Sequence, residues 1–268
     1  MLNVLAVSDE PWMFSIKHIQ VICVFGGILI AFFVGMYFAN KKMNMDKRRL
    51  VLQILACTML ALEFVKYINI LSNGGLGNGK ITPGEFPFLL CSMPLYLYPM
   101  VAFSKGKLGQ FVSPAAFILG MMGGAIALAY PSAILEVGQP WFLPDRLSFS
   151  IISFPYHTLM VMFAGYMLQS KIFKFRIGDL WKAYVVTLGL ATIAIILNIV
   201  IPTADFFMLG HGLGNPLGFL IDAAGLPVYI LVMLSLGCFV IFLLYLYPLI
   251  KWAIARKKTK SEATSDDE

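Results

Sequence analysis

The sequence predicts an all-α, polytopic membrane protein with seven transmembrane helices, and three observations lead to this fold class. Of the 268 residues, 59% are hydrophobic and 13% are charged, and the mean hydropathy is +0.82. This composition excludes a soluble globular domain. The apolar stretches have the length of about 20 residues that a helix needs to cross the hydrocarbon core. They are continuous rather than alternating, which excludes a transmembrane β-barrel.

Seven apolar stretches follow one another along the chain, and we expect each to form one helix. The expected helices cover about 16–39, 49–72, 86–104, 111–130, 147–169, 180–201 and 226–250. Little sequence lies outside them. We therefore expect a single seven-helix domain over residues 1–255 and a short, polar, disordered cytoplasmic tail over residues 256–268.

The basic residues predict the orientation of the helices. They follow the first, third, fifth and seventh stretches, as at Lys41, Lys105, Lys171 and Arg256, whereas the opposite loops hold isolated ones such as Lys80. The positive-inside rule then places the N-terminus outside and the C-terminus in the cytoplasm of a multi-pass plasma (cytoplasmic) membrane protein. Because the net charge of +6 lies at helix ends, it indicates contacts with lipid headgroups and not with nucleic acid.

The third stretch contains a candidate nucleophile. It reads EFPFLLCSMPLYLYP, and in it Cys91 and Ser92 precede Pro94, which should break the helix. A thiol beside a hydroxyl at such a break can be a nucleophile, or it can simply pack among apolar neighbours. The other cysteines, for which packing is explanation enough, are Cys23, Cys57 and Cys238. None of the four forms a CxxC pair, so a disulfide framework and a thiolate metal cluster are not expected.

Several polar residues lie inside the predicted spans, where each needs a partner or a function. Glu63 and Lys66 share one helical face, His157 lies within the fifth stretch, and Asn198 and His18 lie near outer helix ends. Glu63 and Lys66 can form a structural ion pair or line a cavity, and a lone histidine is most often a packing residue. At ~1.5 Å per residue, these groups and Cys91 fall in the outer half of the membrane, at the depth of lipid ester bonds.

A shared depth predicts one site built from these residues. A thiol attacks a carbonyl as the thiolate and therefore needs a base, which His157 can supply with Glu63 or Asn198 orienting its ring. Lys66 or the Ser92 hydroxyl can stabilise an oxyanion.

The outer connection over residues 202–225 is rich in Gly and Phe and carries four polar residues of interest. We expect this loop to dip back into the bundle or to lie on the membrane surface. Asp205, His211, Asn215 and Asp222 lie in it, and the last three are candidates for binding a substrate headgroup.

Segments along nearly the whole chain resemble the YwaF-like integral membrane proteins, which include the animal transmembrane protein 164 type of phospholipid acyltransferase. The matching residues are His18, Glu63 in ALEFVKY, Cys91 in FPFLLCSMPLYL, His157 in SIISFPYHTLMV, Asn198 in ILNIVIPTADFFML and Asp222 in PLGFLIDAAGLPVYIL. The resemblance implies a seven-helix enzyme in which Cys91 takes an acyl chain as a thioester and passes it to a lysolipid, with His157 as its partner. The chain departs from the family pattern in the outer loop, at 203–206 and 214–216.

The leading hypothesis is therefore a membrane-embedded acyltransferase or acyl hydrolase that acts on phospholipids or lysolipids at the outer leaflet and uses neither a cofactor nor a metal. In a second hypothesis, His18, His157 and His211 hold zinc with Glu63 or Asp222 for lipid hydrolysis, although no two of these histidines share a helix at metal-binding spacing. A third is a non-enzymatic transporter or receptor-like bundle in which the charges of the second helix line a solute path.

Overall fold

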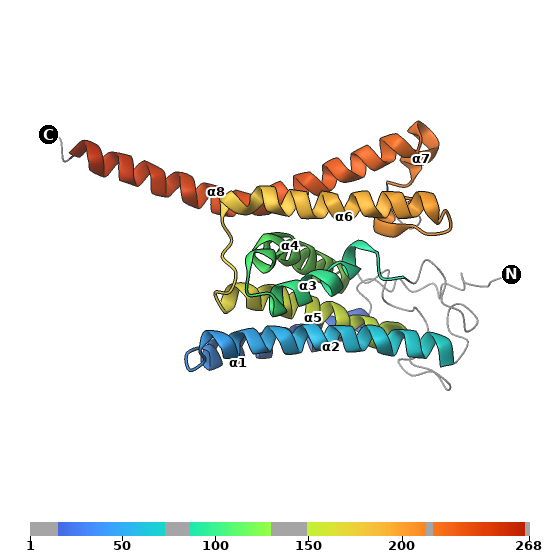
Figure 1. Ribbon diagram of the computed structural model, residues 1–268. Helices are drawn as coiled ribbons and strands as arrows, with labels where there is room; N and C mark the ends of the chain where they lie inside the picture. Colours follow the sequence, from blue (N-terminus) through green and yellow to red (C-terminus); the bar gives the residue numbers. More distant parts are fainter. Residues whose placement is uncertain (1–15, 73–85, 130–148, 213–216, 266–268) are drawn as a thin grey trace.

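The computed structural model describes residues 16–72, 86–129, 149–212 and 217–265. Within these ranges every regular element is a helix (Figure 1). The elements are α1 (Ile16–Asn40), α2 (Met45–Ser72), η2 (Leu90–Ser92), α3 (Pro94–Phe103), α4 (Lys107–Ala129), α5 (Phe149–Gln169), η4 (Ile177–Asp179), α6 (Leu180–Val200), η5 (Phe206–Met208), α7 (Phe219–Ala224) and α8 (Leu226–Ser265).

Six of these helices are long and apolar enough to cross a membrane, and a seventh apolar segment is shorter. The long ones are α1, α2, α4, α5, α6 and α8, and the short one covers Leu90–Phe103. These seven apolar segments confirm the predicted fold class of an all-α, polytopic membrane protein, and the chain is multi-pass.

The third helix is shorter than the sequence predicted. We expected it over 86–104, but the chain forms one turn of 3-10 helix, η2, and then α3. Pro94 is the first residue of α3, a position that needs no backbone N–H donor. A helix of ten residues is about 15 Å long, roughly half the hydrocarbon thickness. The break predicted at Pro94 is therefore present, and Cys91 lies in the short turn before it.

The C-terminal helix is longer than predicted. α8 continues to Ser265 and so includes most of the segment for which the sequence predicts disorder. The division of the chain at residue 255 remains a prediction. The short helix α7, which the apolar pattern does not indicate, comes just before α8.

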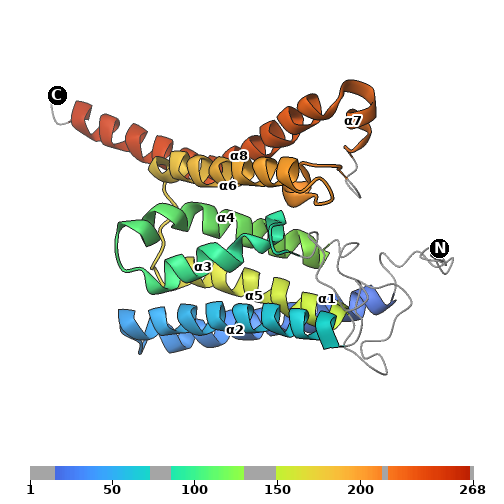
Figure 2. The same cartoon turned by 45° about the vertical axis from the view of Figure 1, so that its right-hand side comes forward.

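α4 and α5 form the centre of the bundle. α4 packs against α3, α5 and α6, and α5 also packs against α1 and α2. α8 lies against α6, so that these two helices form an outer layer beside α3 and α4 (Figure 2). Large aliphatic side chains on the outer faces of α1, α6 and α8 are exposed, as lipid-facing surfaces require.

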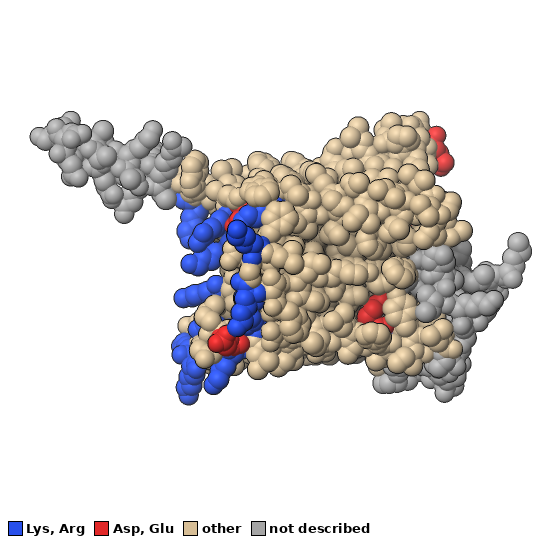
Figure 3. Space-filling view, viewed as in Figure 1, with Lys and Arg blue, Asp and Glu red and all other residues tan. Residues whose placement is uncertain are grey.

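One end of the bundle is basic. Figure 3 shows Lys and Arg side chains gathered there. Two arginines at this end bind the carbonyl groups that the last turns of helices leave free. Arg48 donates to the carbonyl oxygens of Asn40 and Ser170, at 2.6 and 3.2 Å, and Arg49 donates to three at the end of α3. The positive-inside rule predicts that this end is cytoplasmic.

A close contact among α3, α4 and α5 positions the third segment. The Tyr98 hydroxyl of α3 donates to the Met160 carbonyl of α5 at 2.7 Å, and its ring stacks on Phe163 at 3.7 Å between centroids. The Tyr98 hydroxyl occupies the space that a Cβ on Gly120 of α4 would need. This glycine therefore allows α4 to approach α3. As a result, the segment that precedes Tyr98 lies close to both central helices, α4 and α5.

Candidate active site

Cys91 lies where the 3-10 turn η2 contacts the two central helices. Its side chain is half-buried. A Cβ added to Gly123 of α4 would lie 3.6 Å from the Cys91 Cα and 3.0 Å from the methyl carbon of Met160 of α5. A larger residue at this position would press on both neighbours. The absence of a side chain at Gly123 thus lets Cys91, α4 and α5 meet at one point.

Three polar side chains that the sequence singled out surround the thiol. Glu63 and Lys66 form an ion pair one turn apart on α2, and their side chains are only 13% and 18% exposed. The charges of both residues act on the Cys91 thiol, and the Ser92 side chain lies beside it. The structure therefore brings together Cys91, Ser92, Glu63 and Lys66, from the segments α2 and η2.

His157 is hydrogen-bonded within its own helix. The residue is 5% exposed, and its Nδ1 lies 2.8 Å from the Ser153 carbonyl oxygen. Because a carbonyl only accepts hydrogen bonds, Nδ1 carries the proton and Nε2 is the nitrogen that can act as a base. The group that orients the imidazole is thus the Ser153 carbonyl, one turn earlier. In the part of the chain that the structure describes, no hydrogen bond joins His157 to Cys91.

The Tyr156 hydroxyl of α5 lies within electrostatic range of the Cys91 thiol. Charge at Cys91, and then at Glu63, acts on the Tyr156 hydroxyl. Neighbouring residues of an α-helix point about 100° apart, so when Tyr156 faces η2 and α2, His157 is turned away from them. The backbone of His157 faces α4 instead, where a Cβ on Gly124 would lie 2.8 Å from its carbonyl oxygen.

Tyr156 is the site residue that sequence reasoning missed. It is 7% exposed, and its hydroxyl has no hydrogen-bond partner among the described residues. Buried tyrosine hydroxyls normally have one. The available signal was its position in FPYH, directly before His157. Because tyrosines are common near membrane interfaces, this position by itself does not indicate a functional residue.

Asn198 holds the outer loop in place. Its side-chain amide donates to the Phe206 carbonyl at 3.0 Å, and its carbonyl oxygen accepts from the Phe206 N–H at 2.8 Å. The buried Phe206 and Phe207 pack against Phe88, and the Phe207 N–H donates to the Phe88 carbonyl at 3.2 Å. This part of the loop dips into the bundle, one of the two expected outcomes, and covers the chain just before η2.

The hydrogen bonds of two other predicted residues of this loop stay within the loop. The Asp205 carboxylate accepts from the N–H groups of Gly210 and His211, at 2.7 and 3.0 Å. The His211 Nε2 lies 2.5 Å from the Pro202 carbonyl oxygen, so this ring helps to close the loop. Asp222 is exposed in the first turn of α7.

Two further predictions fall outside the described part of the structure. Asn215 lies in the segment 213–216, and the side chain of His18 is likewise not described although α1 includes its backbone. Among the described residues, no three His, Cys, Asp or Glu side chains lie close enough to hold one metal ion. The described residues therefore do not assemble the histidine set of the zinc hypothesis.

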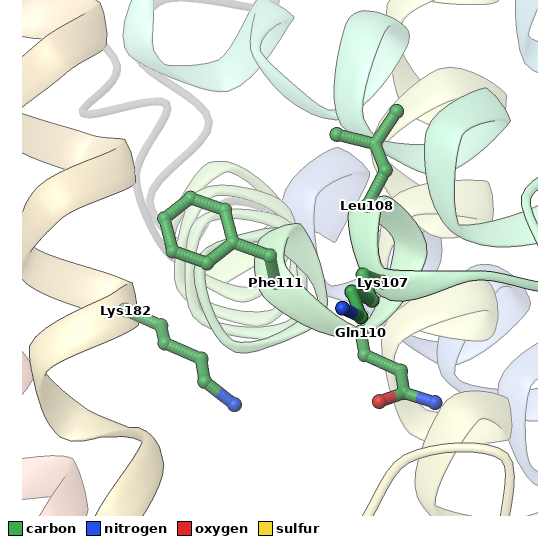
Figure 4. A pocket seen from close by; sticks show the side chains of 5 residues that line it. All are labelled: Lys107, Leu108, Gln110, Phe111 and Lys182. Carbon is green, nitrogen blue, oxygen red and sulfur yellow. The ribbon is translucent and has the colours of Figure 1, made fainter.

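A separate pocket of about 440 Å³ lies at the basic end of the bundle, between α4 and α6. Figure 4 shows it lined by Lys107, Leu108, Gln110, Phe111 and Lys182. Lys107 begins α4, whereas Gly123, which adjoins Cys91, lies about 24 Å further along that helix at 1.5 Å per residue. This pocket is therefore not part of the cysteine site.

Comparison with known proteins identifies one family. The family model described as the TMEM164 family matches residues 13–245 of the chain. Neither a curated protein nor a solved structure matches the chain. The matched range contains Cys91, its polar neighbours and the whole of α5.

Proposed function

Because the chain belongs to the TMEM164 family, we propose that this multi-pass membrane protein is a lipid acyltransferase or acyl hydrolase with Cys91 as its nucleophile. Its substrates are the acyl esters of phospholipids in the outer leaflet, and His157 is its base. Phospholipids and lysolipids are its partners.

The environment of Cys91, compared with those of the other cysteines, is the observation that supports this proposal. Cys23 and Cys57 are exposed on the outer faces of long helices. Cys238 is half-buried on α8, where the Tyr184 hydroxyl donates to its backbone carbonyl. Cys91 alone among the four lies at a helix break beside an ion pair. Polar and charged groups close to a thiol can activate it and stabilise the charges that form during acyl transfer.

The reaction has two balanced halves. The thiol proton of Cys91 goes to Nε2 of His157, the sulfur bonds to the ester carbonyl carbon, and the carbonyl π electrons move to the oxygen. When the C=O bond forms again, the ester C–O bond breaks and the leaving lysolipid alkoxide takes the proton from His157. In the second half, the hydroxyl of an acceptor lysolipid attacks the thioester and releases the thiol. Water as the acceptor gives hydrolysis instead.

The hydrogen bond to Ser153 selects the His157 tautomer that this role requires, but the ring must move. The hydrogen bond from Nδ1 to Ser153 leaves Nε2 free to accept the thiol proton. Catalytic hydrogen bonds often form only when substrate is bound. The proposal therefore includes rotation of the His157 side chain toward Cys91 when lipid enters the site.

The experiment is detection of an acyl group on Cys91. The full chain is reconstituted in vesicles with a phospholipid that carries isotope-labelled acyl chains, and hydroxylamine-sensitive label is mapped by mass spectrometry. We expect label on the peptide that contains Cys91, and no label or transfer in Cys91→Ala. Cys238→Ala is the matched control and should behave like the natural chain.

The same assay tests the base. His157→Gln should slow formation of the adduct by roughly 10²- to 10⁴-fold, the contribution typical of a general base. Unchanged transfer in Cys91→Ala would refute the cysteine mechanism, and unchanged adduct formation in His157→Gln would remove His157 from it.

A further inference from the structure

We propose that Tyr156 is a catalytic residue whose hydroxyl donates a hydrogen bond to the oxyanion that forms when the Cys91 thiolate attacks an ester carbonyl. This inference deepens the proposed function and rests on it. It adds a residue that neither the sequence motifs nor the family resemblance singled out.

The first support is that the Tyr156 hydroxyl is buried and has no hydrogen-bond partner among the described residues. Tyr156 is 93% buried, and in the described part of the chain its hydroxyl makes no hydrogen bond. A buried polar group without a partner destabilises the folded state, so such a group needs an explanation. One explanation is a partner that is present only when substrate is bound.

The second support is the position of this hydroxyl beside the thiol. The ionisable groups within electrostatic range of it are Cys91, Glu63, Tyr98 and Tyr96, and among them Cys91 has the largest influence. Met160, one turn further along α5, contacts the same Gly123 position as the Cys91 Cα. Tyr156 and Met160 share one helical face because they are four residues apart. This face of α5 is therefore the wall opposite η2.

A comparison with a second tyrosine shows that the lack of a partner is not sufficient by itself. The Tyr245 hydroxyl on α8 is also buried and without a hydrogen-bond partner among the described residues. The charged groups that act on it are Asp179 and Tyr184, and no thiol is among them. Of these two tyrosines, Tyr156 alone combines an unused hydroxyl with a nearby thiol. That combination is what assigns it to catalysis.

The chemistry requires a donor at this position. Attack by sulfur converts the carbonyl oxygen from a weak acceptor into a full negative charge, and a fixed O–H dipole stabilises the charged form more than the ester. In surroundings from which water is excluded this difference is large. Lys66 already forms an ion pair with Glu63. Ser92 adjoins Cys91 in the same short segment, so Tyr156 supplies a donor from the opposite wall.

The test compares Tyr156→Phe with Tyr245→Phe in the full chain, reconstituted in vesicles of isotope-labelled phosphatidylcholine. The rate of hydroxylamine-sensitive acylation of Cys91 is measured, together with the rate at which a small maleimide alkylates the same thiol. Alkylation by maleimide adds sulfur to a carbon–carbon double bond and leaves no oxyanion at the position of an ester oxygen. It therefore reports access and reactivity of the thiol alone.

We expect Tyr156→Phe to slow acylation by roughly 10²- to 10³-fold, the effect typical of losing one oxyanion donor, with alkylation unchanged. Tyr245→Phe should change neither rate. Equal acylation in Tyr156→Phe and the natural chain overturns the inference while leaving the proposed function intact. A parallel fall in alkylation overturns it as well, because the residue then acts on the thiol or on the fold. If the natural chain forms no adduct, the proposed function fails and the role of Tyr156 falls with it.

Discussion

Replacing Asn198 with Ala tests whether this residue holds the outer loop or serves the histidine. Its side chain makes two hydrogen bonds to the backbone of Phe206, which is 2% exposed. Removing them leaves one buried N–H and one buried carbonyl of Phe206 without partners. Each such group costs about 1–3 kcal/mol, so the loop should lose about 2–4 kcal/mol of local stability when partial rehydration is allowed.

The backbone of this loop makes the effect local and observable. Phe207 and Met208 have φ angles of 58° and 57°, in the left-handed region that non-glycine residues avoid. Such conformations persist only where the surroundings enforce them. Here the Phe88 carbonyl accepts from the Phe207 N–H, and the Tyr229 hydroxyl donates to the Met208 carbonyl at 2.6 Å. Without Asn198 fewer contacts hold the strained residues, so the loop should open.

Hydrogen–deuterium exchange on the protein in detergent or nanodiscs measures this opening. A loss of 2–4 kcal/mol corresponds to roughly 30- to 700-fold faster exchange of the amides over residues 204–210. Thr192→Ala on the same helix is the control, because its exposed hydroxyl bonds only to the Leu188 carbonyl one turn away. Exchange in Asn198→Ala as slow as in the control would refute this reasoning. A loss of acylation with an undisturbed loop would return Asn198 to the catalytic site.

Two further substitutions test the packing and the charges around Cys91. Gly124→Val should destabilise the protein by about 1–3 kcal/mol, because a side chain at this position meets the α5 backbone. The unfolding temperature in detergent should therefore fall. Gly27→Ala is the control, because the space around Gly27 is open. Glu63→Gln should cost about 3–5 kcal/mol because it removes the carboxylate that pairs with a largely buried ammonium, whereas the double variant Glu63→Gln/Lys66→Met should recover most of this loss. Equal unfolding temperatures for the single and double variants would show that the ion pair is not what stabilises α2.

Much of the fold could be predicted because a membrane constrains the chain residue by residue. Within hydrocarbon each backbone group must be satisfied inside its own helix, so continuous apolar stretches of about 20 residues locate the helices. The predicted limits of the first, fifth and sixth helices agree with α1, α5 and α6 to within two residues. The third segment departs from this pattern because Pro94, which lacks a backbone N–H, is the first residue of α3, and the four residues before η2 are not helical.

Part of the site could be predicted for a similar reason. Glu63 and Lys66 pair because residues three apart share a helical face, and both lie within electrostatic range of Cys91. Asn198 does not have the expected partner, because its side-chain amide bonds to a loop residue eight positions later. A hydrogen bond to a folded-back loop is set by the path of that loop, which no helical periodicity describes.

What the sequence determined by itself is therefore the all-α membrane fold, whereas the depth of the polar groups and the choice of Cys91 among four cysteines remain predictions. Only the tertiary structure decided which side of α5 faces that cysteine. Tyr156 and His157 are neighbours at the same depth, but their side chains point about 100° apart. The rotation of α5 about its own axis is set by its close contacts with α3 and α4 at Tyr98, Gly123 and Gly124. These contacts place Tyr156 near the thiol and leave His157 bonded to Ser153. The reason is that packing against neighbouring helices fixes the rotation of a helix, whereas its own pattern of apolar residues does not.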